Sequence, residues 1–243
     1  MDIEILRSNI VAMDTDAIVL PANEHLKEGP GASRAIFEAA GRKALTRDCK
    51  ELKYCELGSA VVTFGHNLQS DYIIHAVIPK WIDGQHDEYA YLSSAYISCL
   101  KLADVLKIKS LAFPLLASGN NGFDINLAIE IALESINSYN SEHLEKIIFV
   151  VNSTKVANAF EKLGFEVNLL PENIAILEKK VLKKKNKIQA INILKTEGKR
   201  VGIELAKAAE EELIDAALKA IRDPDTRKNI LENGKKVFKK VSN

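Results

Sequence analysis

The stretch from Leu111 to Asp124 most constrains what this chain can fold into. It begins with a short apolar run, Leu111 to Phe113, that is typical of a buried strand, and it continues as a small polar loop rich in glycine and asparagine. Apolar residues then recur at helical spacing from Leu127 to Ile136. A glycine loop between a strand and a helix is a common phosphate site, because the backbone can come close and the free N–H groups at the helix start favour negative charge. Glycine that serves only the turn is the competing interpretation.

The same alternation of strand and helix extends along most of the chain. We expect Pro21 to end the second strand, Gly41 and Gly164 to end helices, and Ser153 to cap the start of one. Strands that alternate with helices predict an α/β fold whose mixed, mostly parallel sheet is covered by helices on both faces. The expected strands are 3–6, 17–20, 60–64, 72–77, 111–113, 147–151 and 165–169, and the expected helices are 32–40, 43–53, 89–106, 127–136 and 153–163.

Composition favours a soluble protein. Of the 243 residues, 47% are hydrophobic and 27% charged, which is ordinary for a globular domain. No apolar run approaches the roughly 18 residues of a membrane span, so we expect no membrane partner. The sequence begins without a secretory signal pattern, and its three cysteines are too few for a disulfide framework, so we expect a cytoplasmic location.

The net charge of zero hides two segments of opposite sign. Residues 1–170 hold 15 Lys and Arg against 22 Asp and Glu, a charge of −7, and residues 171–243 hold 18 against 11, a charge of +7. Strand patterns also stop after Pro171. We therefore expect a first domain over 1–170 and a basic, all-helical extension over 171–243. The lysines between 179 and 187 suit a nucleic-acid or protein partner, a solvated helix face or a contact with the acidic first segment, and we favour the last two.

Several stretches, in this order, resemble the macrodomain family, which binds ADP-ribose. The resemblance covers residues 1–165. It implies a three-layer α/β/α fold with the ligand held between two loops at the carboxyl ends of strands, and it implies neither a metal nor another cofactor. The stretches that carry it are Asn9-Ile10, Thr15 to Glu24, Gly29 to Ile36, Leu57 to Thr63, Ile73 to Pro79 and Ser118 to Phe123.

The resemblance also assigns a role to individual positions. Asn9 and Ile10 are implied at the adenine end, together with Val151 and Asn152, where the family often has an aromatic residue and stacking would be weaker here. Asn23 and Phe123 are implied at the distal ribose, with Asn23 as the tentative catalytic residue, and Ala22 before it is implied as a further ligand-binding position. The two loops are implied to bind the diphosphate through Gly29, Gly31, Ala32 and Ser33 and through Ser118, Gly119, Asn120, Asn121 and Gly122.

Three of these positions have a purely structural alternative. Asn9 stands where the family has aspartate; its carbonyl can accept from the adenine amino group without charge assistance, or it is simply a turn residue. The amide of Asn23 can both donate to and accept from a vicinal diol, or it caps a turn. Phe123 packs beside the ribose, or it anchors the helix start in the core.

The first loop leaves catalysis open. Ser33 stands where many hydrolytic members have aspartate, Arg34 replaces a glycine, and Pro30 removes a backbone donor. A serine without a partner is a poor general base. One hypothesis is that a bound water, positioned by the substrate diphosphate, hydrolyses mono-ADP-ribosyl or O-acetyl-ADP-ribose linkages. The alternatives are a non-catalytic reader of ADP-ribosylated macromolecules and an adaptor that works through residues 171–243.

Two other groups are interpreted as structural. His75 lies within an apolar run, so we expect a hydrogen-bonded core histidine rather than a catalytic one. Asp83, His86, Asp87 and Glu88 do not match a standard metal-binding spacing, so we expect a solvated loop that leads into a helix.

Overall fold

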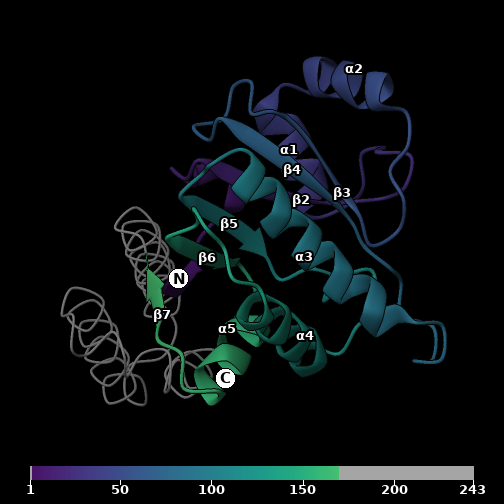
Figure 1. The fold of residues 1–243 in the computed structure, drawn as a ribbon. Coiled ribbons are helices and arrows are strands. Elements are labelled where there is room, and N and C mark those ends of the chain that lie inside the picture. Colours follow the sequence, from purple (N-terminus) through teal and green to yellow (C-terminus); the bar gives the residue numbers. More distant parts are fainter. Residues whose placement is uncertain (1, 170–243) are drawn as a thin grey trace, which may run out of the picture. The chain divides into compact units, whose positions relative to one another are not determined.

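The computed structural model describes residues 2–169, and the predicted extension over 171–243 lies outside them. Within this range, strands and helices alternate as expected (Figure 1). The strands are β1 (Asp2–Arg7), β2 (Ala17–Ala22), β3 (Ala60–Phe64), β4 (Tyr72–Val77), β5 (Ser110–Pro114), β6 (Lys146–Val151) and β7 (Val167–Leu169). The helices are the 3-10 turn η1 (Ile10–Ala12), α1 (Ala32–Ala40), α2 (Arg42–Leu52), α3 (Glu88–Val105), α4 (Ile125–Ser138) and α5 (Thr154–Lys162).

One mixed sheet contains all seven of these strands, in the order β3-β4-β2-β5-β6-β1-β7. The pairs β2–β4, β2–β5, β5–β6 and β1–β6 are parallel, whereas β3 runs antiparallel to β4. β2 pairs with β4 along its whole length, from Ala17↔Tyr72 to Ala22↔Val77, but with β5 only at Ala17↔Leu111 and Ile18↔Ala112. The predicted mixed, mostly parallel sheet is confirmed.

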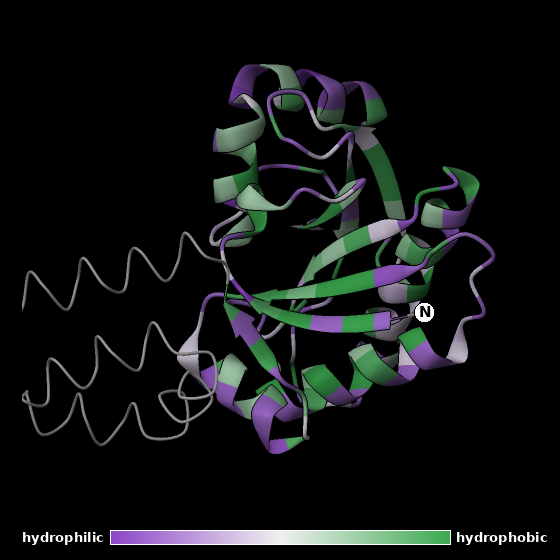
Figure 2. Cartoon of the chain, turned by 90° about the vertical axis from the view of Figure 1, so that its left-hand side faces the viewer, coloured by the Kyte–Doolittle hydropathy of each residue, from purple (hydrophilic) through white to green (hydrophobic). Residues whose placement is uncertain are grey.

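Helices cover both faces of this sheet, because successive strand residues point to opposite sides. Val19, Ile74, Phe113 and Phe149 belong to a buried cluster that includes α3, α4 and α5, and the ring of Phe149 lies 5.4 Å from that of Phe160 in α5. The opposite face is covered by α1 and α2 (Figure 1). Figure 2 shows the strands mostly hydrophobic and the helices with hydrophilic residues interspersed, as a three-layer α/β/α arrangement requires. No helix among the described residues has the length and apolarity needed to cross a membrane.

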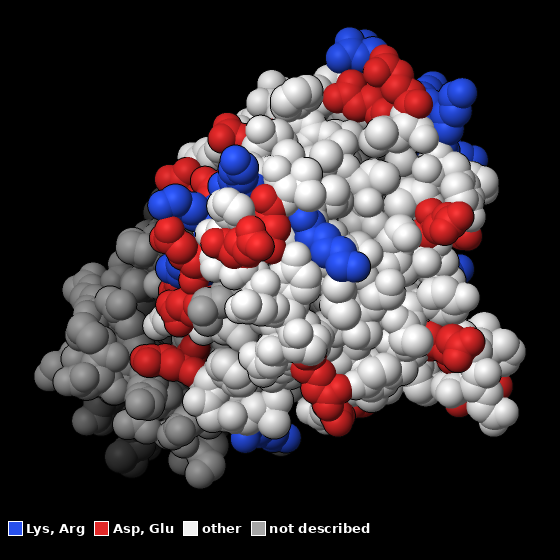
Figure 3. Space-filling model, viewed as in Figure 1, with Lys and Arg blue, Asp and Glu red and all other residues white. Residues whose placement is uncertain are grey.

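Charged side chains of both signs share the face seen in Figure 3. Arg42, the first residue of α2, forms ion pairs with Glu28 at 2.6 Å and with Glu38 at 2.9 Å. The bond to Glu28 uses two guanidinium nitrogens, so it attaches the loop before α1 to the start of α2.

Pro21 does not end β2, so this expectation was wrong. Pro21 pairs in register with Ala76 of β4. The Asp16 and Ala22 carbonyls accept from the N–H groups of Tyr72 and Ile78 on the β4 side. The backbone groups of even-numbered residues in β2 therefore point to β4, and the backbone of Pro21 points to the β5 side. The β2–β5 pairing has already stopped at Ile18, so the missing N–H of proline removes no ladder bond.

The predicted helix boundaries are confirmed by their caps. Gly41 adopts a left-handed conformation at the end of α1, and Gly164 has φ +87° just after α5. The Ser153 hydroxyl accepts from the Lys155 N–H at 3.3 Å at the start of α5.

His75 is a core histidine, as expected. It is fully buried in β4, and its Nε2 lies 2.9 Å from the Thr63 hydroxyl of β3, whereas its Nδ1 has no hydrogen-bond partner among the described residues. Burial lowers the pKa of His75 to about 4, against a small opposite effect of Asp48. The ring is therefore neutral in the folded protein at neutral pH.

We expect acid to destabilise the protein partly through His75. Its pKa in the folded state lies below the unfolded value of 6.5, so the unfolded chain binds the proton first and stability falls as pH drops from 6.5 towards 4. A difference of this size corresponds to about 3 kcal/mol at most. Urea unfolding at pH 7 and pH 4.5 should show a smaller acid loss in His75→Gln, which can still bond Thr63. Equal losses in both proteins would contradict this role.

Candidate functional site

The carboxyl ends of β2 and β5 form the point where the chain changes direction across the sheet. β2 and β5 are neighbours and parallel, but after β2 the chain continues to β3 and β4 on one side, and after β5 it continues to β6 on the other. Open α/β sheets bind ligands outside the carboxyl ends of strands at such a point. The first loop (residues 23–31) and the second loop (residues 115–124) therefore emerge at the same edge of the sheet.

The first loop leads into a helix whose initial N–H groups are open. Gly31 at the N-cap has φ +64° and ψ −128°, a conformation that essentially only glycine adopts, and it has no side chain with which to cap α1. The N–H groups of Ala32, Ser33 and Arg34 donate to no described residue. The positive end of α1 therefore remains available to an anion.

Ser33 fastens this loop. Its hydroxyl accepts from the Gly29 N–H at 3.0 Å, and the residue is only 2% exposed. No described carboxylate or imidazole is hydrogen-bonded to the Ser33 hydroxyl. Ser33 therefore shapes the turn between Gly29 and α1 and has no partner that would activate it as a base.

The second loop also presents open amides. Its two ends are held by internal bonds: Ser118 N–H donates to the Leu116 carbonyl, and Gly122 N–H donates to the Gly119 carbonyl at 3.0 Å. Between them, the N–H groups of Gly119, Asn120 and Asn121 donate to no described residue. Consecutive backbone N–H groups in a turn form a concave donor surface that suits a phosphate.

The start of α4 is not the anion site that its sequence suggested. The Asp124 carboxylate accepts from the N–H groups of Asn126 at 2.8 Å and Leu127 at 3.2 Å. This cap satisfies the first donors of α4 and places a negative charge there. The expected free N–H groups at this helix were therefore a wrong prediction, and the open donors lie in the loop before it and at the start of α1.

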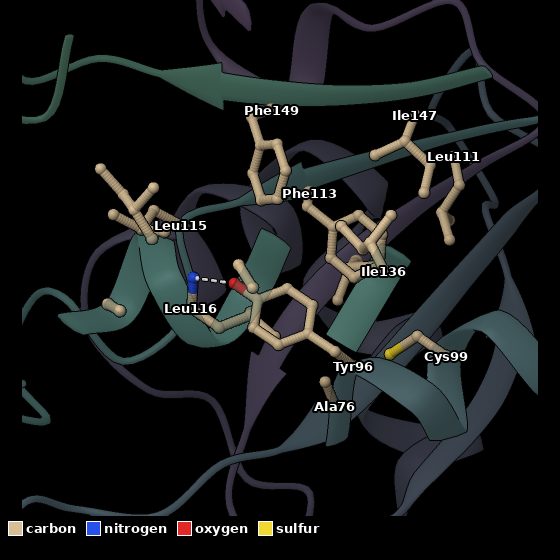
Figure 4. Packing of buried hydrophobic residues seen from close by; sticks show 14 of the residues in the cluster. Ala76, Tyr96, Cys99, Leu111, Phe113, Leu115, Leu116, Ile136, Ile147 and Phe149 are labelled. Atoms are coloured by element: carbon tan, nitrogen blue, oxygen red, sulfur yellow. Dashed lines mark hydrogen bonds between the residues drawn. The ribbon is translucent and has the colours of Figure 1, made fainter. Parts of the chain in front are cut away.

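Two residues that sequence reasoning left among ordinary core or loop positions hold the second loop in place. The hydroxyl of Tyr96 in α3, fully buried, accepts from the Leu116 N–H at 3.1 Å (Figure 4). Its ring packs 5.3 Å from Phe113, and burial raises the pKa of Tyr96 far above its usual range. In the sequence, Tyr96 is only one of the regular apolar positions of a helix, so no local pattern marks it.

Trp81 is the second such residue. Its backbone N–H donates to the Asn121 backbone carbonyl at 2.7 Å, and its ring packs edge-on against the ring of Phe123, with 5.1 Å between the ring centroids. The Asn121 amide in turn donates to the Pro79 carbonyl at 2.7 Å. The segment after β4 thus lies along the second loop, and Asn121 and Phe123 are anchors of this packing.

Glu88 organises the segment that follows Trp81. Its carboxylate accepts from the N–H groups of Ile82, Asp83, Gly84 and His86 at 2.8–3.2 Å. Burial raises the pKa of Glu88, but bonds from backbone N–H groups outweigh it and bring the pKa down to about 2. Asp83, His86 and Glu88 lie within 4.8 Å of one another, yet both Glu88 oxygens are already occupied by these donors. This arrangement supports the structural interpretation of the loop.

The other end of the site lies where β6 and β1 finish. Ser8 N–H donates to the Val151 carbonyl at 3.2 Å, so Asn9 follows β1 at the same edge of the sheet at which Asn152 follows β6. The Asn9 side chain caps η1 by accepting from the Val11 N–H at 3.4 Å. The side chain of Val151 is buried in the core cluster, whereas Asn9 and Asn152 are exposed.

The predicted site residues thus lie at one edge of the sheet, and they differ in their exposure to solvent. Seven are exposed, four are half-buried and five are buried. The exposed ones are Asn9, Asn23, Gly31, Gly119, Asn120, Gly122 and Asn152, the half-buried ones are Gly29, Ala32, Ser118 and Asn121, and the buried ones are Ile10, Ala22, Ser33, Phe123 and Val151.

Replacement of Tyr96 by Phe should loosen the second loop. The variant leaves the buried N–H of Leu116 without a partner, which costs about 1–3 kcal/mol of unfolding free energy. Amide hydrogen exchange at residues 116–121 should accelerate. Tyr139→Phe is the matched control. It removes the hydroxyl by which Tyr139, at the end of α4, donates to Asp104 in the last turn of α3. Unchanged exchange at residues 116–121 in Tyr96→Phe would contradict the anchoring role.

Comparison with known proteins agrees with this geometry. A family model described as the Macro domain matches residues 19–132. A macro domain-containing protein of Caldanaerobacter subterraneus is 38% identical over 171 residues, which cover 68% of this chain and 97% of that protein. An O-acetyl-ADP-ribose deacetylase of Pantoea vagans is 41% identical over 138 residues, which cover 55% of this chain and 80% of that protein.

Solved structures show the same fold. A mutant of the Oceanobacillus iheyensis macrodomain with ADPR superposes with a TM-score of 0.62 at 30% identity, covering 66% of this chain and 90% of that one. A Trypanosoma brucei macrodomain in complex with ADP-ribose gives a TM-score of 0.59 at 26% identity, covering 66% and 68%. With a relative matched over almost its whole length and the sheet, loops and open amides described above, the chain belongs to the Macro domain family.

Proposed function

We propose that this chain binds ADP-ribose, or an ADP-ribosyl group on a macromolecule, across the loops that follow β2 and β5. One observation carries the proposal: the neighbouring strands β2 and β5 lead into two rows of open backbone amides, Ala32 to Arg34 and Gly119 to Asn121. Such donors suit a diphosphate. The O. iheyensis and T. brucei relatives with ADPR or ADP-ribose support this choice of ligand.

The order of strands suggests how the ligand lies. β2, β5, β6 and β1 follow one another in the sheet, so Asn23, the second loop, Asn152 and Asn9 occur in that order along its edge. Neighbouring strands are about 4.8 Å apart, so this row spans about 14 Å. A diphosphate at the second loop therefore places the distal ribose near Asn23 and the nucleobase near Asn152 and Asn9.

Asn23 can orient the distal ribose while it caps its own turn. Its Nδ2 donates to the Lys27 carbonyl at 2.7 Å, and its Oδ1 accepts from the Lys27 N–H at 3.1 Å, which supports the turn-capping interpretation. One amide hydrogen and one lone pair of the oxygen remain. The exposed amide is thus held in one orientation with a donor and an acceptor left for a diol.

Gly119→Glu should abolish ADP-ribose binding without unfolding the protein. A Cβ at Gly119 meets no atom within 4 Å, and its backbone conformation does not require glycine, so the side chain is tolerated. The new carboxylate would repel the diphosphate, and we expect affinity to fall by at least about 100-fold in a calorimetric titration. Gly119→Ala is the matched control and should bind like the wild type. Equal affinity of the Glu variant would exclude the diphosphate from this loop.

Hydrolysis is the second candidate function. It is favoured by the relatives named O-acetyl-ADP-ribose deacetylase in P. vagans and Escherichia fergusonii. The acidic groups near the first loop are engaged elsewhere, because Glu28 pairs with Arg42 and Glu24 accepts from the Tyr54 hydroxyl at 2.9 Å. We therefore propose that the substrate diphosphate positions the attacking water, which releases acetate and ADP-ribose from O-acetyl-ADP-ribose.

Acetate release separates an enzyme from a non-catalytic reader. An enzyme should show many turnovers per protein molecule, and Asn23→Ala should reduce the rate about 10-fold or more if the amide orients the ribose. Ser33→Ala should retain turnover, because its hydroxyl serves the loop and not proton transfer. ADP-ribose binding without acetate release would identify a reader.

The chain outside the described residues has its own proposed role. We infer from its charge of +7 that residues 171–243 are a separate, basic domain, for which an adaptor role with a protein or nucleic-acid partner is the alternative to a solvated face or a contact with the acidic first segment. A chain ending at Leu170 that keeps every partner interaction would overturn this adaptor function. We also infer a cytoplasmic location, which the three buried free cysteines support.

A further inference from the structure

We propose that Glu88 is a positioning residue of the anion site, because its carboxylate shapes the segment that holds the open amides of the second loop in place. This segment, the β4–α3 segment (residues 78–87), connects β4 to α3, and Glu88 is the first residue of α3. The inference rests on the proposed function, since it concerns the affinity of the second loop for a diphosphate. It assigns part of that affinity to a side chain outside both loops.

The Glu88 carboxylate gathers the backbone of the β4–α3 segment. Its Oε1 accepts from three consecutive N–H groups, those of Ile82, Asp83 and Gly84, at 3.0–3.2 Å. Its Oε2 accepts from the His86 N–H at 2.8 Å, and the residue is only 2% exposed. The segment contains no helix or strand, so one buried side chain supplies acceptors that regular structure would otherwise supply.

Trp81 lies between this turn and the second loop. Gly84 has φ +85°, and a Cβ at this position would lie only 3.0 Å from the Trp81 ring. The turn that Glu88 closes therefore passes directly against the indole. The same indole packs edge-on against the ring of Phe123, with 5.1 Å between the centroids. The position of the turn is thus transmitted to the second loop through one aromatic side chain.

Hydrogen bonds complete this connection at Asn121. Its backbone carbonyl accepts from the Trp81 N–H at 2.7 Å, and its side-chain amide donates to the Pro79 carbonyl at 2.7 Å. Asn121 is the last residue of the row of open amides that begins at Gly119. Because neighbouring planar peptide groups share a Cα atom, the placement of Asn121 determines where this row of N–H groups points.

The β4–α3 segment has no substitute in this role. Among the described residues, it supplies every hydrogen bond that joins residues 119–121 to a part of the chain outside the second loop. Tyr96 acts earlier, at Leu116, and the bond from Gly122 to the Gly119 carbonyl closes the loop only on itself. A change in the turn at Glu88 should therefore reach the open amides without being compensated by another anchor.

The sign of the effect separates positioning from simple charge. Bonds from backbone N–H groups keep the pKa of Glu88 low, so the side chain is ionised at neutral pH. Removal of this negative charge would by itself favour an anionic ligand. In Glu88→Gln, however, the new NH₂ group faces at least one backbone N–H whichever way the amide turns, which leaves donors without a partner. A lower affinity therefore reports lost positioning.

Calorimetric titration of the full chain with ADP-ribose tests this role. We expect the affinity of Glu88→Gln to be about tenfold lower than that of the wild type. The fluorescence of Trp81, the single tryptophan of the chain, should shift to longer wavelength before ligand is added, because the loosened segment exposes the indole. Asp83→Asn is the matched control: it removes the same charge from the same segment and keeps an oxygen for the Gln85 N–H. It should bind ADP-ribose at least as tightly as the wild type, with unchanged emission.

Asp104→Asn controls for a general loss of stability. The Asp104 carboxylate also accepts several hydrogen bonds, but at the other end of α3, so its replacement should lower the unfolding free energy and leave the affinity unchanged. Wild-type affinity in Glu88→Gln, or an equal loss in Asp104→Asn, would overturn the proposal while ADP-ribose binding stands. If the wild type itself does not bind ADP-ribose, the proposed function fails, and this inference fails with it.

Gly84→Ala decides the case if Glu88→Gln does not fold. The added methyl group would push the Trp81 ring away from the turn that Glu88 closes. The affinity for ADP-ribose should then fall as well, again with a shift in the emission of Trp81. An affinity equal to that of the wild type would show that the turn does not act on the second loop, and the proposal would be overturned.

Discussion

The bond between the Tyr96 hydroxyl and the Leu116 N–H connects the core to the site. Tyr96, in α3, is fully buried against the rings of Phe113 and Phe149, so close packing sets the position of its hydroxyl oxygen (Figure 4). That oxygen fixes the Leu116 N–H near the start of the second loop. Trp81 then holds the far side of the loop through the Asn121 carbonyl. The loop can leave its central amides open because both of its ends are secured elsewhere.

Backbone donors, and not charged side chains, dominate the electrostatics of this site. Fixed N–H groups lose no side-chain entropy when they bind, and their orientation is set by the fold. The starts of α1 and α4, the two helices that follow the loops, differ in how many backbone N–H groups remain open. Asp124 satisfies the start of α4, whereas Gly31 has no side chain and leaves the start of α1 open. This difference supports the proposed anion site at the start of α1 and the second loop, and not at the start of α4.

Sequence patterns predicted the fold well because strand and helix periodicity reflect burial on a sheet. They gave β3 and β4 with their observed ends and α1 with both boundaries. The prediction that Pro21 ends β2 was wrong because a proline costs a strand a hydrogen bond only where a neighbouring strand pairs with it. Whether β5 pairs opposite Pro21 depends on the tertiary structure and not on the local sequence. The roles of Tyr96 and Glu88 were not predicted for a related reason: each side chain accepts from backbone N–H groups of another segment, and no local pattern reveals which donors a side chain will meet.

Two departures from the macrodomain pattern have a common physical effect. The resemblance implies aspartate at the positions of Asn9 and Ser33, and in both cases the neutral residue bonds a nearby N–H, Val11 in one loop and Gly29 in the other. Each neutral residue therefore holds the backbone of its loop without placing a negative charge beside the proposed anionic ligand. At an effective dielectric constant of about 20, like charges about 8 Å apart repel by about 2 kcal/mol, so their loss favours binding of a diphosphate. Both side chains are neutral where the resemblance implies a carboxylate. In the proposed site this combination favours binding of nucleotides over activation of water.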